Sequence, residues 1–268
     1  MNSQQIIYQV DAFANEPFRG NPAGVCIMEN EPSIQWMQNI AMEMNLSETA
    51  FVFPKDGKRA IRYYTPASEI KLCGHATLSA SHIMYEQGFA AENEEIVFSS
   101  KAGELTIKKE GSWITMNFPA YPLTRIDAAD EFTKMTGLIS AEIYEAGEGW
   151  TLAVMKNETE IRNAAPVLAT MKHSRFNDLI ITAPSDDPKF DFCVRCFAPG
   201  VGIDEDPVTG SAHCALAPFW SEKTGKNDFV SHQVSRREGV LKVSLKGNRV
   251  SISGQAVTVF KAELYIKQ

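Results

Sequence analysis

The chain has 268 residues, and 26 Lys and Arg against 33 Asp and Glu give it a net charge of −7. That charge predicts no affinity for nucleic acid or for anionic membrane surfaces, although local positive charge could still bind a small acid. Five cysteines without regular spacing, no signal peptide and no apolar run long enough to span a membrane predict a soluble cytoplasmic protein.

The first half of the chain is predicted to combine short strands with two helices. A β-rich run at residues 6–13 ends in a turn-rich loop at 15–24. Apolar residues recur at helical spacing after Ser33, and a second helix is expected over residues 75–85, before Gly88. Further strands are expected at residues 25–28, 47–54, 61–64, 95–98, 104–109 and 113–118.

The second half repeats this order after a predicted domain boundary at residues 119–122. Helices are expected at 132–137, 157–171 (interrupted by Pro166) and 212–224, and strands at 151–155, 179–182 and 190–197, with three more up to residue 253. The last strand, at 256–266, has no counterpart before the boundary. We therefore expect one domain from residues 1–119 plus 256–268, and a second from residues 120–255.

The internal repeat is the strongest feature of the sequence. Arg62-Tyr63-Tyr64-Thr65-Pro66 precedes Gly74, and Arg195-Cys196-Phe197-Ala198-Pro199 precedes Gly210. Three glycine pairs hold one register, because 210−74, 239−103 and 247−111 all equal 136. A repeat of this size predicts two similar units whose matching elements meet across a pseudo-two-fold cleft.

The helices after Gly74 and Gly210 carry small and apolar residues on all sides, which is typical of buried helices. Several antiparallel strands must then surround each of them. The predicted fold class is α+β, with two pseudo-symmetric domains, each a mostly antiparallel, barrel-like sheet wrapped around a central helix. The parallel layout of a dinucleotide-binding fold does not fit this pattern.

Each helix start is a candidate anion site. A helix N-terminus exposes unpaired N–H groups and partial positive charge, so two of them facing one cleft would bind a carboxylate. His75 is expected in the first turn of one helix and Ser211 in that of the other. The helix dipole predicts a neutral His75, and the apolar neighbours of Glu48 predict a raised pKa for its carboxyl group.

Several sequence blocks resemble the PhzF-like family, which comprises the phenazine-biosynthesis isomerase and its relatives of the diaminopimelate-epimerase fold. These blocks are Val10-Asp11-Ala12-Phe13, Phe18-Arg19-Gly20-Asn21-Pro22-Ala23-Gly24-Val25, Ser47-Glu48-Thr49-Ala50-Phe51, Cys73-Gly74-His75-Ala76-Thr77 and Glu205-Asp206-Pro207-Val208-Thr209-Gly210-Ser211-Ala212-His213. They cover essentially the whole chain in the family's order.

The resemblance implies an active site between two domains, chemistry without a cofactor or a metal, and a homodimer. It implies that Glu48 moves a proton within the substrate, and that His75, Asp206 and Ser211 assist. Cys73 and Thr209 stand where the related epimerases carry two opposed thiols, so a two-thiol racemase is not expected. Gly74, Gly210 and Ser211 are expected to present donors to the substrate anion, and Asn21 to lie in a binding loop.

Alternative interpretations exist for the same residues. Taken singly, Glu48 is an ordinary strand carboxylate, His75 a helix-start residue, Asp206 part of a turn and Ser211 an N-cap. Cys193 and Cys196 with His213 and Cys214 do not form a zinc motif, because an odd separation points the first two thiols to opposite faces of a strand. The hydrolase motif glycine-x-serine-x-glycine is also missing around Ser211.

We therefore predict a cofactor-independent isomerase that moves a proton in a small, anionic carboxylic acid, with a cyclic amino acid as one candidate. A one-base epimerase and a non-catalytic binding protein of the same fold are the alternatives. The sequence names neither the substrate nor the pathway.

Overall fold

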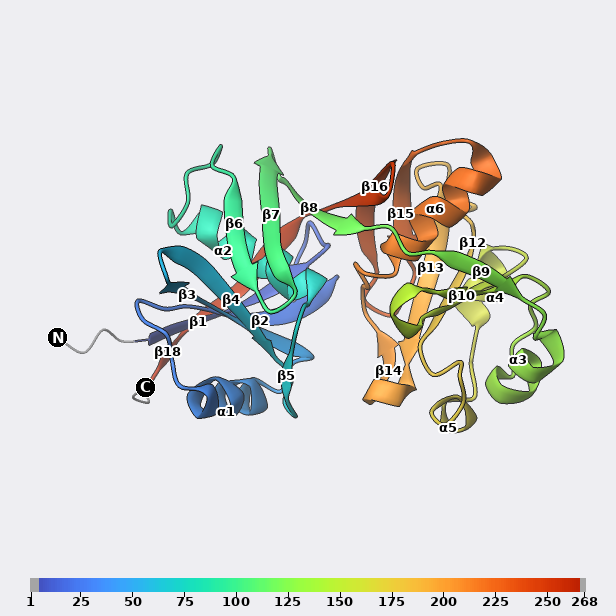
Figure 1. Ribbon diagram of the computed structural model, residues 1–268, viewed down its shortest axis with the longest axis horizontal. Coiled ribbons are helices and arrows are strands. Elements are labelled where there is room, and N and C mark those ends of the chain that lie inside the picture. Colours follow the sequence, from blue (N-terminus) through green and yellow to red (C-terminus); the bar gives the residue numbers. More distant parts are fainter. Residues whose placement is uncertain (1–4, 266–268) are drawn as a thin grey trace. The chain divides into compact units, whose positions relative to one another are not determined.

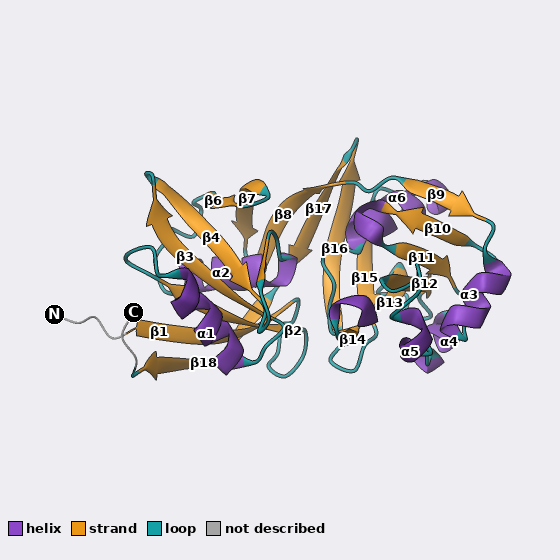
Figure 2. Ribbon diagram, turned by 60° about the horizontal axis from the view of Figure 1, so that its bottom comes forward, coloured by secondary structure: helices purple, strands orange, loops and turns teal. Residues whose placement is uncertain are grey.

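The computed structural model describes residues 5–265, which fold as two compact units (Figure 1). Unit 1 comprises residues 5–117 and 253–265, and unit 2 comprises residues 118–252. Strands outnumber helices in both units (Figure 2), which confirms the predicted α+β class. No helix among the described residues is both long enough and apolar enough to cross a bilayer.

Unit 1 contains a mixed, mostly antiparallel sheet with two helices. β18 pairs antiparallel with β1, so the C-terminal strand belongs to this unit. The elements are β1 (Gln5–Ala12), β2 (Asn21–Ile27), α1 (Ile34–Met44), β3 (Glu48–Lys55), β4 (Lys58–Tyr64), β5 (Glu69–Ile70), α2 (Gly74–Glu86), β6 (Ile96–Ser100), β7 (Gly103–Glu110), β8 (Trp113–Pro119) and β18 (Ala256–Leu264).

Unit 2 has the same plan with additional short helices. Its elements are β9 (Leu123–Ile126), α3 (Ala129–Thr136), β10 (Ile143–Ala146), η1 (Gly147–Gly149), β11 (Thr151–Val154), α4 (Glu158–Asn163), α5 (Leu168–Met171), β12 (Leu179–Pro184), β13 (Phe192–Ala198), η2 (Pro199–Val201), β14 (Ile203–Asp206), α6 (His213–Thr224), β15 (Asp228–Gln233), β16 (Gly239–Lys246) and β17 (Arg249–Gly254).

The strand pairings confirm the predicted internal repeat. In unit 1, β2–β3 is parallel, β3–β4 antiparallel, β4–β6 parallel and β6–β7 antiparallel. In unit 2, the same four pairings recur in the same order as β11–β12, β12–β13, β13–β15 and β15–β16. Matching positions in the two units can therefore be compared directly by register.

The two central helices are buried nearly all round, as predicted. α2 lies against β1, β2, β3 and β18, and buried residues occupy every face of its first half. α6 is likewise buried from its first residue, His213, through Trp220 except at Pro218. Helices of this kind have no polar face to expose, so the surrounding strands fix their positions.

The residues that cap helix α1 explain where it begins and where it ends. The Ser33 hydroxyl accepts a hydrogen bond from Trp36 N at 3.2 Å, which satisfies one of the free N–H groups of the first turn. Asn45 ends the helix in the left-handed conformation, with φ of 50°. The next strand, β3, starts three residues later, at Glu48.

Candidate active site

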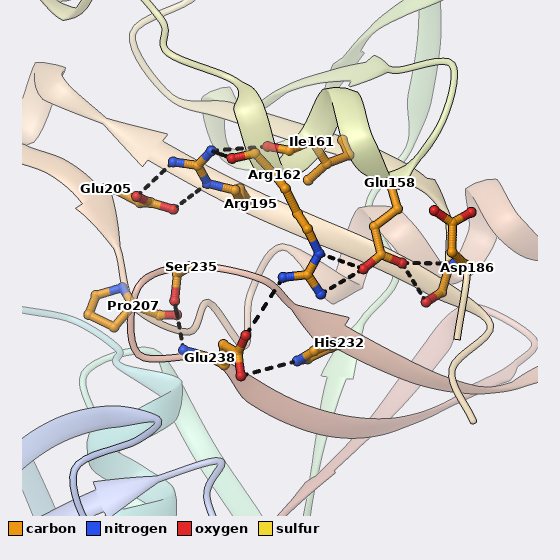
Figure 3. A network of polar contacts seen from close by, with 11 residues as sticks. Glu158, Ile161, Arg162, Asp186, Arg195, Glu205, Pro207, His232, Ser235 and Glu238 are labelled. Atoms are coloured by element: carbon orange, nitrogen blue, oxygen red, sulfur yellow. Dashed lines mark hydrogen bonds and ion pairs between the residues drawn. The ribbon is translucent and has the colours of Figure 1, made fainter. Parts of the chain in front are cut away.

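A matching Arg–Glu ion pair holds the chain ahead of the central helix in each unit. In unit 1, the guanidinium group of Arg62 in β4 makes a bidentate contact with the carboxylate of Glu69 in β5. In unit 2, Arg195 of β13 contacts Glu205 of β14 in the same way, through Nε at 2.6 Å and Nη2 at 3.0 Å (Figure 3). A bidentate guanidinium–carboxylate contact fixes orientation as well as distance.

Arg195 also ties this segment to a neighbouring helix. Its Nη1 donates to the carbonyl oxygens of Ile161 and Arg162 (Figure 3). It also donates to the carbonyl oxygen of Ala164, so all three acceptors lie at the C-terminal end of α4. The last carbonyls of a helix lack partners within the helix, so a cation is favourable there. The chain that leads to the turn before α6 is therefore held from two sides.

Glu48 and His75 form a direct contact in unit 1. Glu48 is the first residue of β3, and His75 is the second residue of α2. Their Oε2 and Nε2 atoms lie 3.1 Å apart, and the residues are only 8% and 7% exposed. The structure thus brings together two of the three predicted catalytic residues.

Two further side chains complete this cluster. Cys73 precedes α2 as its N-cap residue, and its Sγ lies 3.4 Å from His75 Nδ1. Ser47 Oγ lies 3.4 Å from His75 Nε2. Cys73 was predicted as a substrate-binding residue, whereas Ser47 was missed because only its neighbour Glu48 was singled out.

The charge states expected from sequence are wrong for both residues of the pair. Burial by itself would raise the pKa of Glu48, but the charge of His75 and hydrogen bonds from His75, Ser47 and Cys73 outweigh burial and lower it. Burial likewise opposes a charged His75, but its contacts with Cys73 and Glu48 raise the pKa of His75 well above its usual value. The prediction from the sequence took the helix dipole and burial into account, but not the attraction between Glu48 and His75.

The cluster is therefore a buried carboxylate–imidazolium pair beside a neutral thiol. Burial, followed by the nearby Glu48 charge, raises the pKa of Cys73, so its sulfur keeps its proton. The two charged groups lie in direct contact, so they titrate as a coupled pair. A carboxylate held ionised in a dry site is suited to remove a proton, and its partner is suited to stabilise the resulting charge.

The same three side chains could in principle hold a metal ion. One donor atom from each of Glu48, Cys73 and His75 lies within 4.8 Å of the other two. Such a set of oxygen, sulfur and nitrogen donors suits Zn²⁺. The expectation that no metal is needed is untested and stays a prediction.

Asn21 and its neighbours lie at the same edge of the unit 1 sheet as Glu48. Asn21 is the first residue of β2 and is fully buried, and the parallel pairing of Ala23 with Glu48 places both strand starts at one edge. The loop before it is held by Asp11, whose Oδ2 accepts a hydrogen bond from Phe18 N at 2.7 Å. Gly20 adopts φ of 68°, and a Cβ there would lie 2.1 Å from Ala12 O.

The predicted residues of unit 2 lie on one tightly braced turn. Thr209 donates its hydroxyl to Asp206 Oδ2, and its backbone N–H donates to Gln233 Oε1 at 2.8 Å. Gln233 Nε2 donates to Asp206 O at 2.8 Å, and His213 Nδ1 lies 3.0 Å from Thr209 O. Gln233 was missed, because a lone Gln on a strand carries no signal in the sequence.

Gly210 and Ser211 are placed differently from the expectation. α6 begins at His213, so Ser211 lies in the turn before the helix instead of in its first turn. Successive bonds from His213 N to Gly210 O and from Cys214 N to Ser211 O tighten this turn in the manner of a 3₁₀ helix. Ser211 is exposed, which leaves its hydroxyl accessible.

Two similar α+β units, each with a buried central helix, define the epimerase-like fold class. The chain belongs to the PhzC-PhzF family of phenazine biosynthesis-like proteins, which matches residues 10–262. This confirms the family resemblance found in the sequence.

Relatives and solved structures agree with this assignment. An uncharacterized isomerase of Halalkalibacterium halodurans is 40% identical, over 97% of this chain and 98% of its own. The crystal structure of a PhzF-family protein from Enterococcus faecalis superposes with a TM-score of 0.93 at 37% identity, covering 98% of this chain and all of that one. Membership of this family and the isomerase named among its relatives confirm the isomerase class that the sequence predicted.

A more distant structure shows the wider fold. The hydroxyproline epimerase of Agrobacterium vitis, solved with trans-4-hydroxy-L-proline, has a TM-score of 0.65 at 11% identity, covering 97% of this chain and 91% of its own. Identity this low shows a shared fold and nothing about the substrate of this chain.

Proposed function

We propose that this protein is an isomerase that moves a proton within a small carboxylic acid by general acid–base catalysis. The observation that carries the proposal is the buried contact between Glu48 and His75 at the start of α2. Family membership supports the class of reaction, and the charge states of the pair support the direction of the first proton transfer.

Glu48 acts as the base in this mechanism. Its carboxylate takes a proton from a carbon of the substrate, which leaves the electron pair of that C–H bond on the substrate as an enolate-like anion. Glu48, now a neutral acid, returns the proton to a different carbon, so the enzyme ends as it began. His75 carries positive charge beside the reacting groups and stabilises the transient anion.

The first turn of α2 supplies the substrate anchor. The helix starts at Gly74, and its N-cap residue Cys73 makes no side-chain capping hydrogen bond. Free N–H groups and the partial positive charge of a helix start bind carboxylates well. Cys73 and Asn21 are proposed to line this anchor.

For unit 2, we propose the roles that the sequence predicted for four residues of the turn before α6: Asp206, Thr209, Gly210 and Ser211. Their support is the bracing of the turn by Gln233 and His213, which fixes donors and acceptors in place before a ligand arrives. Ser211 offers an exposed hydroxyl, and Asp206 offers a carboxyl held by Thr209.

Solvent deuterium exchange tests the proposal. Small cyclic and amino carboxylic acids, including L-proline and trans-4-hydroxy-L-proline, are incubated with the protein in D₂O and followed by NMR and mass spectrometry. We expect deuterium to enter at least one of these acids. Glu48→Gln should abolish this incorporation while the acid still binds, and Glu110→Gln, at an exposed position of unit 1, should leave it unchanged.

The outcome also separates the alternatives. Deuterium at a new carbon indicates an isomerase, whereas deuterium at one carbon with inverted configuration indicates an epimerase. Binding without any incorporation indicates a binding protein. Undiminished incorporation by Glu48→Gln would contradict the role given to Glu48.

A further inference from the structure

The thiol of Cys73 moves no proton in the proposed mechanism, yet its sulfur lies beside the Glu48–His75 pair. Its Sγ atom is 3.4 Å from Nδ1 and 3.8 Å from Nε2 of His75. Donor atoms from a thiol, an imidazole and a carboxylate thus lie within 4.8 Å of one another, and all three residues are buried. Within residues 5–265, no other trio of His, Cys, Asp or Glu donors meets so closely.

The spacing of these donors fits a tetrahedral metal ion. Zinc bonds of about 2.0 Å to nitrogen and oxygen and about 2.3 Å to sulfur, at tetrahedral angles, place the donor atoms about 3.3 to 3.6 Å apart. Two distances from His75 Nε2 lie on either side of this range, at 3.1 Å to Glu48 Oε2 and 3.8 Å to Cys73 Sγ. Small side-chain shifts would therefore complete three ligands and leave the fourth position of the ion for water.

The backbone around these ligands is already held in place. The carbonyl oxygen of Cys73 accepts hydrogen bonds from Thr77 N at 3.0 Å and from Thr77 Oγ1 at 2.6 Å. The Thr77 hydroxyl also lies 2.6 Å from that of Tyr63, and both side chains are fully buried. Glu48 is held by the pairing of β3 with Ala23 in β2. Ligands that are fixed in advance lose little freedom when a metal ion binds.

The chemistry of the three donors selects the kind of ion. Thiolate and imidazole favour Zn²⁺, whereas Mg²⁺ and Ca²⁺ prefer oxygen ligands. Ligation requires sulfur and nitrogen without protons, so the thiol proton of Cys73 and the imidazolium proton of His75 leave to solvent. The carboxylate of Glu48 and the thiolate of Cys73 then balance the two positive charges of the ion. A neutral set of groups is what a buried position favours.

We propose that Glu48, Cys73 and His75 form a Zn²⁺-binding site through which the ion inhibits the protein. This inference rests on the proposed function, because it concerns regulation of the same cluster. A carboxylate bound to zinc is a much weaker base, so Glu48 no longer takes the substrate proton. The imidazole of His75 also loses the charge that stabilises the substrate anion. The reaction itself uses no ion.

Cobalt tests the site by spectroscopy, without any substrate. The full chain is treated with EDTA, kept reduced with a phosphine and titrated with Co²⁺, and Zn²⁺ or excess Mg²⁺ is then added. We expect a thiolate-to-cobalt charge-transfer band that Zn²⁺ removes and Mg²⁺ does not. Cys73→Ala should abolish the band, and His75→Gln should weaken Co²⁺ binding by at least about tenfold. Cys26→Ala, which removes another buried thiol of unit 1, should preserve both the band and the affinity.

Each result decides the inference. The absence of the band in the wild type, or its survival in both Cys73→Ala and Cys73→Ser, would overturn the site; circular dichroism confirms that the variants are folded. Zinc should also stop deuterium exchange into any acid that the wild type labels, and EDTA should restore it. Undiminished exchange at saturating Zn²⁺ would overturn the inhibition. Failure of every acid to exchange would end the proposed function, whereas the cobalt spectrum would still decide the metal site.

Discussion

His213 is predicted to make the stability of the protein depend on pH. Its ring is fully buried, with Nδ1 3.0 Å from Thr209 O and Nε2 2.8 Å from Ser231 Oγ. A carbonyl only accepts, so Nδ1 carries the proton and Nε2 accepts from the serine hydroxyl. Burial lowers the pKa of His213 to about 4.

The size of the effect follows from linkage. An unfolded histidine takes up a proton below a pKa of about 6.5, whereas the folded one does so only below about 4. The contribution of His213 to the free energy of unfolding is therefore fully present above about pH 6.5, and it is lost as the pH falls toward 4. A difference of about 2.5 pKa units corresponds to a loss of roughly 3 kcal/mol.

Urea denaturation of the wild type and His213→Asn at about pH 8 and about pH 4.5 measures this loss. Asparagine keeps a donor for Thr209 O but does not titrate, so residue 213 of the variant should contribute the same stability at both pH values. The stability difference between the two proteins should shrink by about 2.5 kcal/mol at the lower pH. A difference that is equal at both pH values would refute a neutral, buried His213.

Three other changes have defined outcomes. Glu48→Gln removes the anion that holds the proton on His75, so the pKa of His75, followed by NMR titration, should fall; an unchanged value would contradict the ion pair. Gly254→Ala would place a Cβ 2.4 Å from Phe13 Cδ1 and 2.8 Å from Leu78 Cδ1, and thermal unfolding should show a loss of about 1–3 kcal/mol. Arg195→Lys keeps the charge but loses the forked contact with Glu205 and three carbonyls, so a loss of about 2 kcal/mol is expected in urea, and full stability would argue against that contact.

The elements that sequence predicted well carry strong local signals. The helix after Ser33 has an N-cap and a regular apolar spacing, and the central helices are apolar on every side. The short strands β5, β9, β10 and β14 were missed. A strand of two to four residues is stabilised by partners distant in the chain, as β10 is by β9 and β11, and its own sequence carries little preference.

The candidate site shows a similar division. The residue types and their motifs pointed to Glu48 and His75, and the structure places them 3.1 Å apart. Their charges could not be predicted one residue at a time, because each pKa depends on the other group. The part played by Gln233 could not be predicted from the sequence. It comes only from hydrogen bonds to Thr209 and Asp206, which lie on a turn distant in the chain.

The repeat explains why two similar units can serve different chemical purposes. At the matching helix starts, unit 1 carries His75 in contact with Glu48, whereas unit 2 carries the uncharged Ser211. The histidine keeps Glu48 ionised and able to accept a proton, despite burial. The helix start of unit 1 thus carries a charged pair that the matching helix start of unit 2 lacks, although the strands around both helices pair in the same order.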